Sequence, residues 1–502
     1  MNVRNHVGKT IGTSWLSLIV VSAAQLIMIP VALAHLDKTD FALFAIITQV
    51  FVSIMLAEMG VRSACSRLLI DAAAKGKEKY DKVWMASCAV FLFQACLMLT
   101  LTLSVAPLLG RLFDLNAEQS DIVFWIFITV GLKNAVGYLL SVFSTALLAG
   151  QCLHKLNGIN ILNTVAELIG FCILINLGFG LWAYPISAII SFVCSQPLIV
   201  RAAFKNNLVG SFKISLLEWS EVKEIFSLGM DVFVAALFSV AMGHSLLLLS
   251  GYLLTLEETA VLAVNLKLVS MMTQILQRVP GSTNPTLMKM VSEDDYNGYN
   301  AWWGYTAKLT IGLSLVGAGL YVFSSGFVIN VWTSKEGMEM HGVSVLLLSL
   351  VPFRYLVHYI FVNSLTIFKE IRKVKLWLIW EIVLYVMLAL WLGKHYGMVG
   401  LLSANLISML GGALFVGIKY LAYCSRVSFG SLVKLLMKLT VPLSVSLVVL
   451  FLVSLSLPLS PLMNMVTMSF AWVSICSLIV YYFLLEPYER LKILRVVKLT
   501  NK

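Results

Sequence analysis

The chain has 502 residues, of which 60% are hydrophobic and 12% are charged, and its mean hydropathy is +0.91. This composition excludes an ordinary soluble globular protein and indicates an all-α integral membrane protein. The net charge of +11 does not indicate nucleic-acid binding, because no soluble basic domain is present to carry it.

Apolar stretches long enough to cross a bilayer follow one another along the chain. A helix needs about 20 mostly apolar residues to span a hydrocarbon core of roughly 30 Å. The first stretch is too long for a cleavable signal peptide, and no small-residue cleavage site follows its apolar core. We predict about fourteen transmembrane helices, at 11–35, 40–61, 84–110, 122–148, 157–178, 182–200, 225–251, 259–284, 304–331, 342–366, 376–393, 399–418, 439–459 and 465–486.

The positions of the 36 Lys and Arg residues predict the orientation of these spans. With the amino terminus in the cytoplasm, about 27 of them fall in cytoplasmic segments and about four in external loops. The external ones are Lys38, Arg111, Lys335 and Lys394. This positive-inside pattern predicts that both termini are cytoplasmic.

The connections between spans are short, so they leave no room for a soluble catalytic domain. The chain carries no Walker or Rossmann glycine pattern. Its eight cysteines show no CxxC spacing and no clustering with histidine, so neither disulfides nor a metal site is expected. We therefore predict that the protein is not an enzyme and has no cofactor. Energy for any active step would come from ions, lipid gradients or a partner.

Several charged side chains lie inside the predicted spans, and cations outnumber acids. Lys133, Lys267, Arg278 and Arg354 are the deep cations, and His358 follows Arg354 by one helical turn. A charge at membrane depth is costly and usually faces a bundle interior or a watery cavity. We predict that these cations contact an anionic cargo. The alternative is that each one pairs with a buried acid and holds two helices together.

The embedded acids are fewer. Glu167 shares one helix face with Asn160 and Asn163, which gives a polar stripe at positions i, i+3 and i+7. Such a stripe could bind sugar hydroxyls or a coupling cation, and its carboxyl suits proton coupling. Asp231 and Glu381 are nearer the cytoplasmic ends of their spans and are candidate partners for Lys or Arg.

The chain also shows an internal repeat. The segment from Leu36 overlays the segment from Leu256 without gaps, and Gly60 then aligns with Pro280. In both segments a short acidic external loop leads into a span that ends at a helix-terminating residue. Repeats of this kind are typical of secondary transporters. We predict two six-helix bundles and an extra helix pair with a basic tail, at 1–205, 206–425 and 426–502.

Residues 36–69, LDKTDFALFAIITQVFVSIMLAEMGVRSACSRLL, resemble the second-helix signature of the polysaccharide-transport branch of the MOP superfamily, the Wzx-type flippases. The signature is an acidic-x-Gly turn, here Glu58 to Gly60, followed by small residues and Arg67. The family more often has Asp at the position of Glu58. The run FVINVW, which closes at Trp332, also fits the family, and the spacing of the spans extends the resemblance to the whole chain.

The resemblance implies a flippase for undecaprenyl-diphosphate-linked oligosaccharide, such as an O-antigen, capsule or exopolysaccharide repeat unit. It would move this cargo from the cytoplasmic to the periplasmic leaflet of the bacterial inner membrane by alternating access. The implied fold has two six-helix bundles in a V around a central cavity, plus two C-terminal helices. Membrane lipids are further expected partners, glycan polymerase and chain-length proteins are candidate partners, and no nucleic acid is expected. The residues that would contact the diphosphate are Arg278, Arg354, Lys133 and Lys267.

Two other functions stay open at this point. A cation-coupled multidrug exporter of the related MATE branch should have an acid-rich cavity, whereas the embedded charges here are mainly positive. A membrane glycan polymerase or ligase usually carries a large external loop with reactive Arg and His residues, and this chain has no such loop. The sugar composition of the cargo and the coupling ion are left open.

Overall fold

The computed structural model describes residues 3–54, 58, 60–368, 371–457 and 460–480. Helices dominate these residues and no strand occurs among them, which confirms the predicted all-α class. The chain divides into two compact units, Met1–Tyr252 (unit 1) and Leu253–Lys502 (unit 2).

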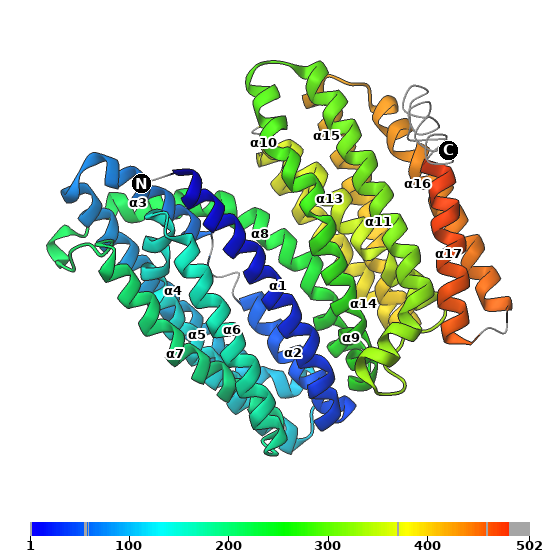
Figure 1. The fold of residues 1–502 in the computed structure, drawn as a ribbon, viewed down its shortest axis with the longest axis horizontal. Coiled ribbons are helices and arrows are strands. Elements are labelled where there is room, and N and C mark those ends of the chain that lie inside the picture. Colours follow the sequence, from blue (N-terminus) through cyan, green and yellow to red (C-terminus); the bar gives the residue numbers. More distant parts are fainter. Residues whose placement is uncertain (1–2, 55–57, 59, 369–370, 458–459, 481–502) are drawn as a thin grey trace, which may run out of the picture. The chain divides into compact units, whose positions relative to one another are not determined.

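Unit 1 consists of long helices joined by short connections (Figure 1). Helix α4 packs along α5, and α6 packs against both α1 and α7. Short 3₁₀ turns precede α7 and α8, at Gly180–Trp182 and Ile214–Leu216. The helices of unit 1 are α1 (Val3–His35), α2 (Lys38–Ile54), α3 (Val61–Lys75), α4 (Lys77–Leu112), α5 (Ala117–Ala149), α6 (Leu153–Asn176), α7 (Ala183–Lys205) and α8 (Trp219–Leu253).

Unit 2 is organised around α11, which packs against α9, α10, α13, α16 and α17. A π-helical stretch, η4 (Leu410–Gly417), continues directly from the end of α14. The α-helices of unit 2 are α9 (Leu256–Leu276), α10 (Arg278–Ser292), α11 (Tyr296–Thr333), α12 (Val343–Ser349), α13 (Val351–Ile367), α14 (Ile371–Met409), α15 (Ile418–Ser425), α16 (Phe429–Ser456) and α17 (Pro461–Ile479).

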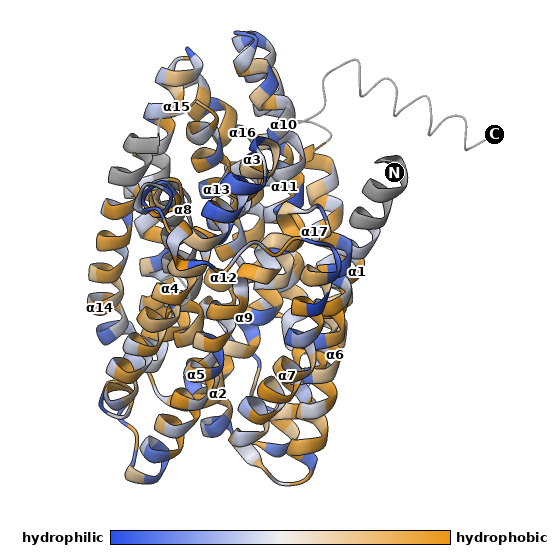
Figure 2. Cartoon of the chain, turned by 90° about the vertical axis from the view of Figure 1, so that its left-hand side faces the viewer, coloured by the Kyte–Doolittle hydropathy of each residue, from blue (hydrophilic) through white to orange (hydrophobic). Residues whose placement is uncertain are grey.

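Eleven helices in the described part of the chain are long and apolar enough to cross a membrane. Figure 2 shows hydrophobic residues along most of the helix lengths and hydrophilic residues gathered towards the helix ends. The predicted number of fourteen spans stays a prediction. Helix α2 is described over 17 residues, up to Ile54. The predicted spans 376–393 and 399–418 follow each other through α14 and η4 without a loop. Their boundary is Gly397, whose backbone is non-helical (φ 57°, ψ −136°).

The connection after α7 belongs structurally to unit 1. Val222 and Ile225, at the start of α8, are buried in the same apolar cluster as Trp84 and Phe91 of α4. Because contacts rather than chain order define a compact unit, unit 1 continues to Tyr252. The first bundle predicted from the sequence ends at residue 205, and the predicted three-part division stays a prediction.

The internal repeat corresponds to a shared helix pattern. In unit 1 the order is α2, α3 and α4, and in unit 2 it is α9, α10 and α11. In the gap-free overlay, Val61 at the start of α3 aligns with position 281, three residues after Arg278 at the start of α10. The second helix therefore begins at nearly the same place in both repeats.

Helix α17 docks on α11 through Trp472. This side chain is fully buried, and its indole N–H donates a hydrogen bond to the carbonyl oxygen of Val316, with 2.9 Å between the two atoms. A glycine makes the close approach possible, because a Cβ atom at Gly319 would lie 2.2 Å from the indole ring. Gly312 lies two turns earlier on α11, and a Cβ atom there would meet nothing within 4 Å.

We expect Gly319→Ala to lower the free energy of unfolding by about 1–3 kcal/mol, because the added methyl group overpacks the α11–α17 contact. The midpoint of thermal unfolding in detergent would measure the loss. Gly312→Ala is the matched control and should leave the midpoint unchanged or raise it, since alanine favours helix. Equal losses in the two variants would contradict the proposed role of the Trp472 contact.

Candidate functional site

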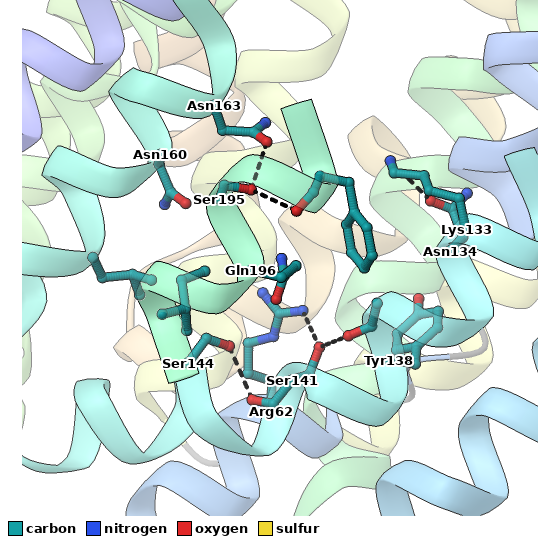
Figure 3. A pocket seen from close by; sticks show the side chains of 14 residues that line it. Arg62, Lys133, Asn134, Tyr138, Ser141, Ser144, Asn160, Asn163, Ser195 and Gln196 are labelled. Carbon is teal, nitrogen blue, oxygen red and sulfur yellow. Dashed lines mark hydrogen bonds between the residues drawn. The ribbon is translucent and has the colours of Figure 1, made fainter. Parts of the chain in front are cut away.

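Unit 1 contains a polar pocket of about 240 Å³ between α3, α5, α6 and α7 (Figure 3). Two of its lining side chains are cationic, most of the others are amides or hydroxyls, and no carboxylate is among them. The lining residues are Arg62, Lys133, Asn134, Gly137, Tyr138, Ser141, Ser144, Leu156, Asn160, Asn163, Phe192, Ser195, Gln196 and Ile199.

Lys133 supplies one of the two positive charges from the middle of α5. Its ammonium donates a hydrogen bond to Asn134 Oδ1 at 3.3 Å and lies 5.9 Å from the centroid of the Phe192 ring. Glu167 on α6 is near enough to interact with it electrostatically. Asn134 is its one hydrogen-bond partner among the described residues, and an ammonium has three N–H donors. Lys133 therefore keeps donors for a ligand.

Amide side chains lie across the pocket from Lys133 (Figure 3). Asn163 Oδ1 accepts a hydrogen bond from Ser195 Oγ at 2.8 Å, which connects α6 to α7 and orients the amide. Asn160 lies one turn earlier on α6, and Gln196 is adjacent to Ser195 on α7. Amides both donate and accept hydrogen bonds, so this wall suits hydroxyl-rich ligands.

Arg62 supplies the second positive charge from the first turn of α3. The preceding Gly60 has φ 65°, a left-handed conformation that glycine adopts readily, and it sets the direction in which α3 begins. The Arg62 side chain pairs through Nε with Glu58 Oε1 at 3.3 Å and donates from Nη2 to Ser141 Oγ at 3.3 Å. The guanidinium is thereby positioned at the pocket wall.

Sequence reasoning missed Arg62 as a site residue, because the positive-inside rule groups it with the cations of the following loop. A signal was present in Glu58, which precedes Arg62 by four residues and so suggests an ion pair across one helical turn. Ser195 and Gln196 were also missed, since hydroxyls and amides are common in membrane helices.

Three of the residues predicted for the site line the same pocket: Lys133, Asn160 and Asn163. Glu167 does not line it, but lies one turn beyond Asn163 on α6 and interacts electrostatically with Lys133. Two of the three residues of the polar stripe inferred from helical spacing thus form part of one pocket wall. The functional roles of these residues stay predictions.

Arg354 and Glu381 form a buried ion pair within unit 2, between α13 and α14. Arg354 is 2% exposed and Glu381 is 0% exposed. The Arg354 Nη2 to Glu381 Oε1 distance is 3.0 Å, and Nη2 also donates to Ser408 Oγ at 3.3 Å. Trp377 Nε1 donates to Glu381 Oε2 at 3.0 Å, and His358 Nδ1 lies 3.6 Å from the same oxygen. This geometry is the one expected if Arg354 holds two helices together, and a diphosphate contact by Arg354 stays a prediction.

The other predicted site residues lie elsewhere. Arg278 is exposed at the start of α10, and Lys267 is half-buried on α9. Asp231 falls within α8, but its side chain lies outside the described residues. None of the predicted cations except Lys133 is a lining residue of the unit 1 pocket.

Solved structures with the same fold are transporters of the MOP superfamily. A multidrug resistance MATE family transporter in an inward-facing conformation aligns with a TM-score of 0.67 at 16% identity, over 81% of this chain and 96% of that chain. The lipid II flippase MurJ in an inward closed conformation aligns with a TM-score of 0.66 at 14% identity, over 95% of this chain and 99% of that chain. A MOP superfamily transporter from Pyrococcus furiosus, described as having a binding pocket of reverse polarity, aligns with a TM-score of 0.57 at 16% identity, over 84% of this chain and 95% of that chain.

No protein-family model and no curated protein matches the sequence. At these identities the structural likeness establishes the fold, which confirms the predicted MOP-type fold in its coarse form. Together with the eleven apolar helices, it identifies a multi-pass membrane protein. The polysaccharide-transport branch stays a prediction.

Proposed function

We propose that the protein is a flippase that moves undecaprenyl-diphosphate-linked oligosaccharide across a membrane by alternating access. The observation that carries this proposal is the unit 1 pocket, which presents Arg62 and Lys133 together with amides and hydroxyls, and has no carboxylate in its lining. Under this proposal the membrane is the bacterial inner membrane and both termini are cytoplasmic.

The chemistry of the pocket suits both parts of such a headgroup. A diphosphate is anionic and cannot cross hydrocarbon unaided. Lysine and arginine can replace its hydration shell with charge-assisted hydrogen bonds. The amides of Asn160 and Asn163 suit sugar hydroxyls, and the Phe192 ring offers an apolar surface to the face of a sugar ring.

The extent of the structural matches also supports a flippase. The MATE transporter aligns with 81% of this chain and the lipid II flippase with 95%. The flippase alignment leaves out 5% of this chain, which is about 25 residues. Helices α16 and α17 together are longer, with 28 and 19 residues. The flippase match therefore includes at least part of this C-terminal helix pair.

A MATE-like exporter of cationic compounds is the second candidate. The TM-score of 0.67 with a MATE transporter favours it, and so do the carboxylates Glu58 and Glu167 beside the two pocket cations. Neither carboxylate belongs to the pocket lining, so the surface offered to a ligand consists of cations and neutral polar groups rather than anions.

Reconstitution into liposomes separates the two functions. A short-chain, fluorescent, diphosphate-linked glycolipid would be placed in one leaflet, and its appearance in the other leaflet would be followed with an added quencher. We expect the protein to accelerate this transfer and not the transport of ethidium, a cationic dye. Transport of ethidium without transfer of the glycolipid would overturn the flippase proposal and favour the exporter.

Asn163→Ala should weaken binding of the glycan headgroup about two- to tenfold, because one net hydrogen bond contributes about 0.5–1.5 kcal/mol. The apparent KM for the glycolipid would measure the change. Asn176→Ala is the matched control. Asn176 is exposed at the far end of the same helix, and its side-chain amide donates a hydrogen bond to the backbone carbonyl of Cys172. An unchanged KM for Asn163→Ala would remove this amide from the binding wall.

A further inference from the structure

Residues 206–218, which we call the strap, connect α7 to α8 and are fastened to unit 1 along their length. The hydroxyl of Tyr80 on α4 donates a hydrogen bond to the backbone carbonyl of Leu208 at 2.7 Å. The backbone N–H of Ser211 donates to Asp81 Oδ1 at 2.9 Å. Both hydrogen bonds engage the strap backbone, so they hold its path rather than single side chains.

Two ion pairs, which we call the clip, fasten the far end of the strap and the first turn of α8 to the start of α4. Lys82 Nζ lies 3.0 Å from Glu218 Oε1, and Lys79 pairs with Glu221. Glu221 is only 4% exposed, so its carboxylate depends on Lys79 for compensation of its charge. Loss of a partner from a buried pair is far more costly than loss of a surface pair.

The middle of the strap fits closely over the indole of Trp84, which is fully buried. A Cβ atom at Gly210 would lie 2.6 Å from this ring system, so the position requires glycine for the contact to form. The Phe212 ring meets the Trp84 ring edge-on, with 5.7 Å between their centroids. The strap is thus seated on unit 1 by shape as well as by charge.

The strap also lies under one end of the polar pocket. The pocket occupies the half of unit 1 in which α5 ends, α6 begins and α7 ends, and Leu156 and Ile199 are among its lining residues nearest that end. These two residues belong to an apolar cluster against which the strap residues Leu208 and Val209 pack. Leu208 and Val209 therefore cover, from the strap side, the apolar cluster that borders this end of the pocket.

We infer that the strap is the closure of the predicted cytoplasmic end of the pocket and that the clip holds it shut. This inference rests on the proposed function, because a flippase would have to open the pocket on this side to receive its cargo. When the clip releases, Leu208 and Val209 lift from the cluster, and the layer formed by Leu156 and Ile199 becomes accessible to water.

Cys152 reports this opening without an engineered label site. It is 9% exposed, belongs to the same cluster and occupies the position directly before α6. Full-length protein in inside-out membrane vesicles would be treated with a membrane-impermeant maleimide, and modification of Cys152 would be followed by peptide mass spectrometry. We expect the Lys79→Ala/Lys82→Ala protein to react about tenfold faster than the parent, because local opening governs access to a buried group.

Two further variants sharpen the comparison. Gly210→Val should also accelerate the reaction, because it wedges the strap away from Trp84 while leaving every charge in place. Lys77→Ala is the matched control, since Lys77 is an exposed cation at the start of α4 that forms no ion pair with the described residues. It should react at the parental rate.

The inference is overturned if Cys152 reacts at the parental rate in both the double variant and Gly210→Val, or if Lys77→Ala accelerates it equally. It is also overturned if acceleration occurs only together with loss of the thermal unfolding transition, since that indicates global unfolding. Glycolipid transfer measured on the same proteins keeps the two proposals apart. A responsive Cys152 in a protein without transfer refutes the flippase alone, and transfer with an unresponsive Cys152 refutes the closure alone.

Discussion

Single replacement of Arg354 or Glu381 by alanine is expected to destabilise unit 2 by about 3–5 kcal/mol, because each change leaves an uncompensated charge in a buried site. The two side chains are 2% and 0% exposed and lie 3.0 Å apart. Such a loss is a large part of the total stability of a typical protein, which is about 5–15 kcal/mol. Both variants should therefore be depleted from the membrane and unfold at lower temperature in detergent.

The residues around Glu381 pack closely on its carboxylate. A Cβ atom at Gly412 of η4 would lie 2.3 Å from Glu381 Oε2, so the π-helical segment packs directly on the carboxylate. The Trp377 indole donates a hydrogen bond to Glu381, and the Ser408 hydroxyl accepts one from Arg354. Removal of one charge would thus also leave neighbouring polar groups without their partners.

Two further variants test the explanation. The double replacement Arg354→Met/Glu381→Leu should recover much of the stability, since apolar side chains of similar size can replace a buried pair at little cost. Arg278→Ala removes an arginine that is exposed on the same unit, and should leave stability near the parental value. Normal amounts of a stable Arg354→Ala protein without transport would contradict the structural role and favour direct contact of Arg354 with cargo.

Lys133→Met is expected to reduce transfer of a diphosphate-linked glycolipid about 10- to 100-fold, since a hydrogen bond to a charged group contributes about 1.5–3 kcal/mol. Methionine keeps the length of the side chain and removes its charge. Stability should hold or rise, because a half-buried ammonium within a predicted span carries a desolvation cost. Transfer in liposomes and the midpoint of thermal unfolding would be measured on the same preparation.

Lys205→Met is the matched control, since this lysine is exposed at the last turn of α7, outside the pocket. It should transport at the parental rate. Parental transport by Lys133→Met would remove the pocket cation from the mechanism. A parallel loss of transport and of the unfolding transition would instead give Lys133 a structural role.

Two arginines, Arg62 and Arg354, show how far sequence reasoning reaches. The positive-inside rule groups Arg62 with loop cations, yet Arg62 lines the pocket because Gly60 redirects the chain and Glu58 and Ser141 hold the guanidinium there. Arg354 was expected to contact cargo, yet its guanidinium lies 3.0 Å from the carboxylate of Glu381, 27 positions away in the chain. Charge and depth alone did not distinguish these two environments.

The polar stripe of α6 was more informative. Helical spacing put Asn160, Asn163 and Glu167 on one face, and two of these residues line the pocket. The spacing did not identify Ser195 and Gln196 of α7, which complete the site. Nor did it assign a role to the strap, whose importance depends on contacts with α4 across more than 100 residues.

The sequence by itself determined the membrane class and the helical repeat, because both depend on local hydropathy and on helix-breaking residues along one segment. Only the tertiary structure decided which embedded charges are paired and which face a pocket. That choice depends on how each helix is rotated about its axis and on which neighbour it meets, and residues distant in the chain fix both. For this reason Lys133 lines a pocket while Arg354 is buried against Glu381, although each is a single cation in an apolar span.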